Sequence, residues 1–450
     1  GLAVQSLFGD SLGRAIQAIA PVSDAALPQA ELWVAIVLLG VIAGAWAIYG
    51  GLASVAWTDF FMLIIMIAGG FSVTVLGLYM LSGEERSLIE GFRVMIERNQ
   101  AGAGVWREAV ERTAPNILYQ STTEYDRLSV IQPVTHELAP WPHLFLDLFS
   151  ISIWYNVINQ FMIQRVLGAK DMYHARMGIV LAGYLKILMP VIVVLPGLIL
   201  FARYPETMLL PWDQIKPQAD RGYVHMLHTL VPIGLRGLFL AALFGAIQST
   251  VNSVLNSTST IITLDMYKRW VRPQATERHL VVVGVWSTII VLAIAIVLGG
   301  FIGRLGKGLF DYIQELYAFF APQFAAIFLL GMLFRRINAA GATITVFGGF
   351  TFGIALKICA QYPWCPGWAR PFMMQASITW VFCTLLCVAA SLLTPPPRPQ
   401  QVTEDLTFNW RRLNLAGGLG HHWYSSVVLW WGLFFLIVTA LVIVFSGLIL

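Results

Sequence analysis

Residues 245–260 read Gly-Ala-Ile-Gln-Ser-Thr-Val-Asn-Ser-Val-Leu-Asn-Ser-Thr-Ser-Thr, inside an otherwise apolar stretch of about 235–265. Ser249, Asn252, Ser253 and Asn256 recur at three- and four-residue spacing, so they share one face of a helix. Polar groups inside a bilayer are costly, and they are functional candidates by default. Hydroxyl and carbonyl oxygens without a strong charge suit a weakly held alkali cation. Hydrogen bonds between helices, made by small residues, are the alternative interpretation.

The composition indicates a polytopic α-helical membrane protein. Of its 450 residues, 58% are hydrophobic and only 12% are charged, whereas soluble domains carry about 25% charged residues. A membrane-spanning helix needs about 20 largely apolar residues. The sequence predicts ten spans, at about residues 31–50, 51–81, 142–164, 173–203, 235–265, 279–300, 309–334, 338–360, 375–394 and 424–449. The first two meet at Gly50-Gly51, which predicts a tight turn there.

The basic residues lie in short connectors on alternate sides of the spans. Arg165 with Lys170, Lys268 to Arg278, and Arg335-Arg336 mark the cytoplasmic side. The long acidic segment 82–141 then lies outside, where Glu84 to Arg98 and Gly104 to Arg112 have helical spacing. The net charge of +4 therefore reflects topology, and it does not indicate nucleic acid as a partner.

Several further polar groups lie within apolar spans. Asp59 stands one turn into a predicted helix, and Lys186 lies in the middle of another, where each is either functional or paired structurally. Pro190 and Pro196 predict a break in the span that carries Lys186, and discontinuous helices are typical of transporter sites.

No constellation of catalytic residues is present in the sequence, which argues against an enzyme. The chain has no nucleophile elbow and no glycine-rich phosphate loop. Cys383 and Cys387 are interpreted as small apolar residues of a helix. Cys359 and Cys365 flank a turn rich in proline and tryptophan, at a spacing that permits a loop disulfide.

Five ordered strings resemble the sodium/solute symporter family, and most closely its sodium–glucose cotransporter branch. The similarity extends over about residues 1–350. The strings are Tyr49-Gly-Gly-Leu-Ala-Ser-Val-Ala-Trp-Thr-Asp59, Trp154-Tyr-Asn-Val-Ile-Asn-Gln-Phe-Met-Ile-Gln-Arg165, Ala182-Gly-Tyr-Leu-Lys186 with Leu195-Pro-Gly197, Asn256-Ser257 with Thr263-Leu-Asp-Met-Tyr-Lys268, and Leu309-Phe-Asp-Tyr-Ile-Gln314.

The resemblance implies an all-α, inverted-repeat fold of five plus five helices, the LeuT-like fold, with the solute near the membrane midplane. It implies one transmembrane transporter domain over residues 1–450. Residues 1–81 would end the first repeat, 82–141 form the extracellular loop, 142–334 form the second repeat, and 335–450 add C-terminal helices. The first core helix of the family is then expected upstream of Gly1.

The resemblance also implies the cation ligands. The principal sodium ion would bind the carbonyl of Ala246 and the hydroxyls of Ser249 and Thr250. Asp59, Ser253 and Asn252 occupy the place of a second sodium site found in some members of the family.

For the solute, the resemblance implies contacts with Gln314 and Lys186 and an aromatic inner gate at Tyr155. Asn156 stands where the glucose branch usually has Trp, and Ser152 stands where a related sugar carrier has Asn. Gln323 replaces the second proline of the family's usual pair. These departures favour another sugar, a polyol or a sugar-like acid over glucose itself.

The resulting hypothesis is a sodium-coupled symporter in the cell membrane that imports a sugar or sugar-like solute by alternating access. Its partners would be a small solute, Na⁺ and the lipid bilayer. The alternatives are a sodium symporter for a carboxylate, an amino acid or a vitamin, and a membrane domain that senses a solute without transporting it.

Overall fold

A computed structural model describes most of the chain as two compact helical units. It describes residues 2–19, 22–100, 128–134, 136, 139–204, 222, 233–302, 309–403, 406–408 and 422–448. The first unit comprises residues 1–120 and 185–309, and the second comprises 121–184 and 310–450. Regular structure in the described residues is helical, apart from an isolated bridge between Gln132 and Pro140.

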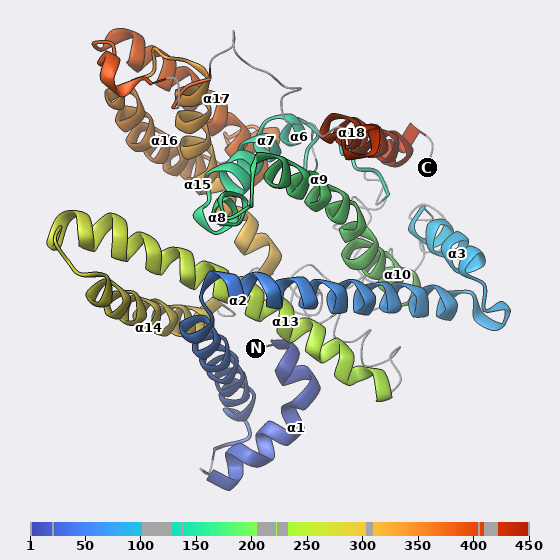
Figure 1. The fold of residues 1–450 in the computed structure, drawn as a ribbon. Coiled ribbons are helices and arrows are strands. Elements are labelled where there is room, and N and C mark those ends of the chain that lie inside the picture. The colour runs from blue at the N-terminus through green and yellow to red at the C-terminus, as the bar shows by residue number, and fades with distance from the viewer. Residues whose placement is uncertain are drawn as a thin grey trace. The chain divides into compact units, whose positions relative to one another are not determined.

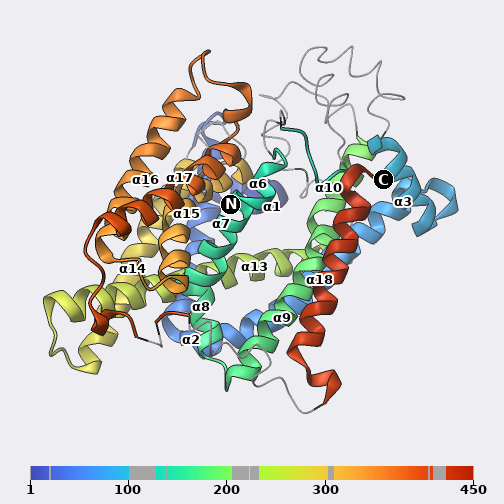
Figure 2. The same cartoon turned by 90° about the horizontal axis from the view of Figure 1, so that it is seen from above.

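The first unit is built around the packing of α2 against α13, which Figures 1 and 2 both show. Helix α14 packs on both of these helices, and α1, α3 and α10 pack on α2. Its elements are α1 (Leu2–Ile19), α2 (Leu27–Leu81), η1 (Gly83–Glu85), α3 (Leu88–Gln100), η4 (Pro190–Val194), α10 (Leu195–Arg203), α13 (Ile233–Thr260), η5 (Ile261–Val271) and α14 (Glu277–Ile302).

The tight turn predicted at Gly50-Gly51 is wrong, because α2 runs as one helix from Leu27 to Leu81. A straight helix of 55 residues would be about 80 Å long, far more than the ~30 Å of a bilayer core. Figure 1 shows that α2 instead changes direction sharply part-way along. Two glycines disfavour a helix by only about 1 kcal/mol each, so helical hydrogen bonding continues through the bend.

The break predicted at Pro190 and Pro196 is also wrong, because α9 (Met172–Met189) continues into α10 through the wide π-helical turn η4. In that turn the N–H of Leu195 donates to the carbonyl of Pro190. The next bond of the same pattern would come from residue 196, which is a proline without an N–H. The hydroxyl of Thr74 in α2 donates to the carbonyl of Val191 instead, at 2.6 Å.

The second unit contains the remaining helices, including residues of α9 up to Tyr184. Its other elements are α6 (Pro142–Phe145), α7 (Asp147–Ile153), η3 (Trp154–Ile158), α8 (Gln160–Leu167), α15 (Leu309–Leu333), α16 (Ala339–Cys359), η7 (Gly367–Ala369), α17 (Phe372–Leu393), η8 (Pro399–Gln401), η9 (Trp423–Ser425), α18 (Val427–Ile443) and η10 (Val444–Leu448).

Small residues bring α16 close to α17, and the two helices lie side by side in Figures 1 and 2. Gly341, Thr345 and Gly349 follow one another at four-residue spacing in α16, and all three are buried. A Cβ built at Gly349 would lie 2.6 Å from the sulfur of Cys383 and 3.0 Å from the Cβ of Gln323. This is the small-residue packing by which membrane helices approach each other.

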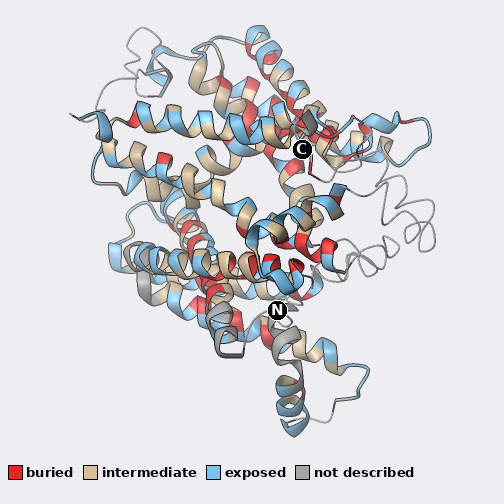
Figure 3. Cartoon of the chain, turned by 90° about the vertical axis from the view of Figure 1, so that its right-hand side faces the viewer, coloured by how far each residue is buried: buried red, intermediate tan, exposed pale blue. Residues whose placement is uncertain are grey.

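Large apolar side chains remain exposed along many helices. Figure 3 shows exposed residues, in pale blue, along most of the helices. Trp57 and Phe347, for example, are 67% and 70% exposed. Surfaces of this kind belong against lipid rather than water. Eight helices in the described residues are long and apolar enough to cross a membrane: Leu27–Ile48, Ala56–Leu81, Met172–Arg203, Glu277–Phe301, Phe310–Leu333, Ala339–Cys359, Phe372–Leu393 and Val427–Ser446.

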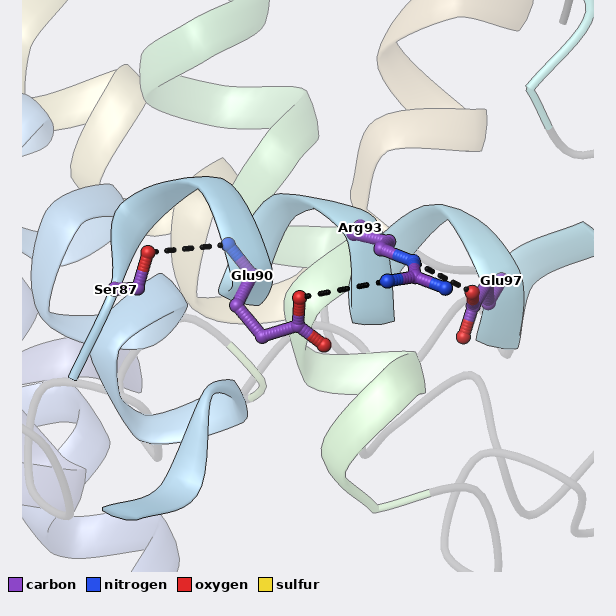
Figure 4. Close-up of polar contacts among 4 residues, drawn as sticks. All are labelled: Ser87, Glu90, Arg93 and Glu97. Atoms are coloured by element: carbon purple, nitrogen blue, oxygen red, sulfur yellow. Dashed lines mark hydrogen bonds and ion pairs between the residues drawn. The ribbon is translucent and has the colours of Figure 1, made fainter. Parts of the chain in front are cut away.

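The predicted outer segment contains α3, which covers most of the stretch from Glu84 to Arg98 that had helical spacing. Figure 4 shows the hydroxyl of Ser87 accepting from the N–H of Glu90, and Arg93 placed between Glu90 and Glu97. The second expected helix, 104–112, lies outside the described residues. The loop disulfide does not form, because Cys359 and Cys365 are both free thiols.

Candidate functional site

The polar face of α13 is a ladder of hydroxyls bonded to their own helix. The hydroxyl of Thr250 donates to the carbonyl of Ala246 at 3.1 Å, and that of Ser253 donates to the carbonyl of Ser249 at 2.7 Å. Ser257 and Thr260 repeat the pattern one turn further on. Each hydroxyl donates its proton to a backbone carbonyl and keeps its lone pairs, so its oxygen can still bind a cation.

The expected sodium ligands therefore form a compact group on one helix. The Thr250 hydroxyl and the Ala246 carbonyl lie within hydrogen-bond distance, and Ser249 is one helical step away. Thr250 also lines a cavity of about 430 Å³ between α2, α13 and α14, whose other walls are apolar. The apolar walls supply no further ligand, so the sodium role of these three residues stays a prediction.

Asp59 lies close to a tight approach of α2 and α13. A Cβ added at Gly245 of α13 would lie 2.3 Å from the sulfur of Met62. Asp59 is three residues before Met62, and the ladder begins one residue after Gly245. The structure thus places Asp59, half-buried, and the ladder on adjoining stretches of two packed helices.

Asn252 is a buried amide without a hydrogen-bond partner. Its side chain is 1% exposed, and neither Oδ1 nor Nδ2 is paired within the part of the chain that the structure describes. An unsatisfied buried polar group costs about 1–3 kcal/mol, and an unsatisfied amide in a native structure requires an explanation. A bound cation would supply a partner for the Oδ1 atom.

The helix expected at 142–164 is broken in the middle. Helix α7 passes through the π-helical turn η3 and stops at Asn159, whose backbone is extended (φ −67°, ψ 122°), before α8 begins at Gln160. Ser152 and Asn156 lie just before this break, and the amide of Asn156 donates to the carbonyl of Ser152 at 3.1 Å. A break of this kind exposes backbone groups to a ligand and is typical of transporter sites.

Aromatic contacts join the broken helix to α15, which carries Gln314. The ring of Tyr155 lies 6.2 Å from that of Tyr317, and the ring of Trp154 lies 5.2 Å from it. Tyr317 is three residues after Gln314, so both are on the same face of α15. The second unit therefore brings Tyr155, Asn156, Ser152 and Gln314 into one region of the fold.

Lys186 is exposed and belongs to the first unit, so its role in solute binding stays a prediction. A different ammonium group lies close to the expected solute residues. Lys357 of α16 forms an ion pair with Glu315, the residue after Gln314, at 2.7 Å. This pair lies beside a small pocket between α15, α16 and α17. The ion pair holds Glu315 toward α16. Because adjacent helical residues point about 100° apart, Gln314 points in a different direction from Glu315.

Two features of this region could not be predicted from local patterns. Asn159 breaks a helix although it is neither glycine nor proline, and only the run of amides around it gives a signal. Tyr317 is one of many aromatic residues, and its pairing with Tyr155 spans more than 150 residues of sequence. The sequence clue to Tyr317 is its position three residues after Gln314.

The chain is similar to several known proteins. The sodium:solute symporter family model matches residues 26–349. The mouse sodium/myo-inositol cotransporter is 31% identical over 406 residues, covering 86% of this chain and 55% of the mouse protein. The sodium/glucose cotransporter of Vibrio parahaemolyticus is 31% identical over 390 residues, covering 84% of this chain and 66% of that protein. The chain thus spans less than two thirds of either relative.

The fold is also similar to that of a solved structure, the substrate-bound outward-open state of a Na⁺-coupled sialic acid symporter. The TM-score is 0.59 at 18% sequence identity, covering 86% of this chain and 70% of that one. This likeness concerns the fold, and it confirms the predicted all-α, inverted-repeat class.

The apolar helices, the broken α7–α8 segment and the polar face of α13 define a multi-pass membrane protein of the transporter class. Within that class, the chain belongs to the sodium:solute symporter family. The family consists of carriers, which argues against the enzyme alternative.

Proposed function

We propose that this protein imports a sugar or a sugar-like polyol across the cell membrane, driven by sodium. The observation that carries the proposal is the grouping of Tyr155, Asn156 and Gln314 at a broken helix, in a chain whose α13 offers a neutral oxygen ladder. Amides and a phenol can bond many hydroxyl groups, and aromatic rings can stack on the apolar face of a sugar ring. The relatives named for glucose and myo-inositol support this solute class.

Sodium would bind first at Ala246, Ser249 and Thr250 and would favour the outward-open state. The solute would then bond Gln314, Lys186 and the side chains before the break, and alternating access would release both ligands inside. Each ligand has to leave again, so binding must be modest. The driving force suffices, because 100 mV contributes about 2.3 kcal/mol per charge and a tenfold sodium gradient about 1.4 kcal/mol. Together they support a solute ratio of a few hundredfold per sodium ion.

The second sodium site, at Asp59, Asn252 and Ser253, is part of the same proposal. It is supported by the unpartnered amide of Asn252 and by the position of Asp59 beside the α2–α13 close approach. A second ion would square the attainable solute ratio. Measuring the number of sodium ions moved per solute would decide between the two stoichiometries.

A carboxylate-bearing solute is the second candidate, and the exposed ammonium group of Lys186 favours it. A domain that only senses the solute would bind it without moving it. These alternatives are separated by one assay, because they differ in which solute accumulates and whether any does.

The test is uptake by the full-length protein in liposomes, with a labelled panel of glucose, galactose, myo-inositol and an acidic sugar. Uptake is measured with an inward sodium gradient and with choline in place of sodium. The proposal predicts sodium-dependent accumulation of a neutral sugar or polyol. Accumulation of the acidic solute alone would replace the sugar assignment, and binding without accumulation would indicate a sensor.

Matched variants test the site. Gln314→Ala should abolish uptake, while Gln361→Ala, in an exposed turn, should not change it. Thr250→Ala should raise the sodium concentration needed for half-maximal uptake. Its control is Thr343→Ala, because Thr343 makes the same bond to its own helix (2.9 Å to the carbonyl of Ala339) in α16. Equal effects of the two threonine substitutions would argue against the proposed sodium site.

A further inference from the structure

The short helices α6 and α7 carry a buried acid that the transport proposal does not use. Asp147, the first residue of α7, is only 1% exposed. Its carboxylate has no hydrogen-bond or ion-pair partner among the described residues, and Oδ1 is fully enclosed. An ionised carboxylate without a partner is disfavoured in such a place, and protonation or a bound cation would stabilise it.

The described residues offer few metal ligands around Asp147. The described residues contain no group of three His, Cys, Asp or Glu side chains that could hold one. The hydroxyl of the neighbouring Ser150 is itself buried and donates to the backbone carbonyl of Asp147, at 3.0 Å. Sodium and other hard cations need several oxygen ligands, whereas a proton needs one. The geometry therefore favours a proton.

Two histidines precede Asp147 in the sequence, and the first of them, His136, belongs to the predicted outer segment 82–141. His143 is four residues before Asp147, about one helical turn away, and is 6% exposed with an unpartnered Nδ1. His136 is half-buried and close enough to act on His143 electrostatically. The three groups become steadily more buried from His136 to Asp147. Chains of His and Asp side chains of this kind carry protons in membrane proteins.

Two helices of the described chain pack on α6 and α7: α17, and α15, whose Ala325 and Ala326 cluster with Ile153 of α7 and which carries Asp311 and Glu315. Helix α17 packs on both, and residues 372–393 contain no acid and no base, only the thiols Cys383 and Cys387. The π-helical turn η3 contributes one titratable group, the phenol of Tyr155. Asp147 is thus the only carboxylate on α6, α7, η3 and α17, and Glu315 of α15 is paired with Lys357.

We propose that Asp147 is a proton-binding site, served from the outer segment through His143 and His136, and that its proton keeps α7 packed against α17. Loss of the proton would leave an uncompensated charge between the two helices. Since α7 leads directly into the turn that carries Ser152, Tyr155 and Asn156, the packing of α7 fixes the position of these side chains. The fraction of Asp147 that carries a proton would therefore set the affinity for solute, and this affinity would depend on external pH.

Infrared difference spectroscopy of the purified protein in lipid tests the site without any need for transport. A protonated carboxylic acid has a carbonyl stretch separate from those of carboxylates and amides. The wild type should show this band near neutral pH and lose it as the pH is raised. Asp147→Asn should remove the band, and Asp171→Asn, which alters an exposed carboxylate, should leave it. Should Asp147→Asn fail to fold, Asp147→Glu should shift the band rather than leave it unchanged.

Uptake assays test the consequence. If only the protonated form binds solute well, the KM for solute should rise about tenfold per pH unit once the carboxyl ionises. Asp147→Asn should show no such rise, and the half-saturating sodium concentration should change little in either protein. A wild type without the infrared band, or an Asp147→Asn variant with the pH response of the wild type, would overturn the proposal. Failure of the sugar assignment alone would leave the infrared result intact.

Discussion

Replacing Asn252 by leucine should make the sodium-free protein more stable. Neither atom of the buried amide is paired, and each unsatisfied buried group costs about 1–3 kcal/mol. Leucine has a similar size and no polar atom, and it also favours a helix slightly more than asparagine does. We therefore expect Asn252→Leu to raise the free energy of unfolding by at least ~1 kcal/mol in the absence of sodium.

In sodium, the wild type should become more stable than the Asn252→Leu variant. An ion that binds only the folded state stabilises it by about 2.7 kcal/mol at a concentration one hundred times its dissociation constant. If Oδ1 of Asn252 is a ligand, the wild type gains this stabilisation in full and the variant gains less. The assay is thermal or denaturant unfolding in micelles, in sodium chloride and in choline chloride at equal ionic strength.

Asn99 provides the matched control. It is a second buried amide, 2% exposed, but its Nδ2 donates to the carbonyls of Met95 and Leu198, at 2.8 and 3.0 Å. Asn99→Leu removes two hydrogen bonds of Nδ2 together with the unpartnered Oδ1, so it should be less stable than Asn252→Leu, which removes no hydrogen bond. It should also leave the response to sodium unchanged. If Asn252→Leu instead destabilises the sodium-free protein as Asn99→Leu does, the reasoning about the unpartnered amide is wrong.

Three further predictions concern packing, an ion pair and acid sensitivity. Gly349→Ala should be about 1–3 kcal/mol less stable than Gly331→Ala. The new methyl group at position 349 would meet side chains at 2.6–3.0 Å, whereas that at position 331 would meet nothing. The unfolding midpoints of the two variants check this prediction. A double-mutant cycle with Glu315→Gln and Lys357→Met should give a coupling of about 1 kcal/mol in unfolding experiments, since one partner is mostly buried and the other half-exposed. Hydrogen bonds from the backbone and then the ring of the histidine three residues on lower the pKa of Asp171. The contribution of Asp171 to stability is therefore present above the usual aspartate pKa, and it is lost as the pH falls through the lowered pKa of the folded protein. Asp171→Asn should remove that part of the acid dependence of the melting temperature.

The control for the ion pair is the exposed pair of Arg93 and Glu97 on α3, joined at 3.1 Å (Figure 4). Exposed pairs at this spacing contribute about 0.3–0.5 kcal/mol. A coupling for Glu315 and Lys357 no larger than this would show that burial adds nothing to their interaction.

The membrane class and the polar face of α13 could be predicted from the sequence, because both depend on local composition and spacing. Hydroxyls three and four residues apart fall on one face in any helix. A tight turn was predicted at the bend in α2 because two spans meet at Gly50-Gly51. In a long apolar segment, however, the backbone has no better hydrogen-bond partner than its own helix.

The continuity of α9 and α10 could not be predicted, because it depends on Thr74, more than one hundred residues away, which bonds the carbonyl of Val191. The break at Asn159 and the contact of Tyr155 with Tyr317 are likewise tertiary effects. Spacing along the chain does not encode which distant residues will meet. For this reason the ligand roles given to Ala246, Ser249, Thr250, Asp59 and Ser253 stay predictions.

The hydroxyl ladder of α13 also bears on which alkali ion the protein accepts. The side chains of Thr250 and Ser253 are held by bonds of 3.1 and 2.7 Å to the backbone of their own helix. Their oxygens therefore cannot move freely inward around a small ion or outward around a large one. If each hydroxyl contributes to its own proposed sodium site, an oxygen held at one radius would disfavour both lithium and potassium. A kink in this helix would separate the hydroxyls from their carbonyl acceptors and let the oxygens move. The protein would then discriminate less between alkali ions, even with every ligand retained.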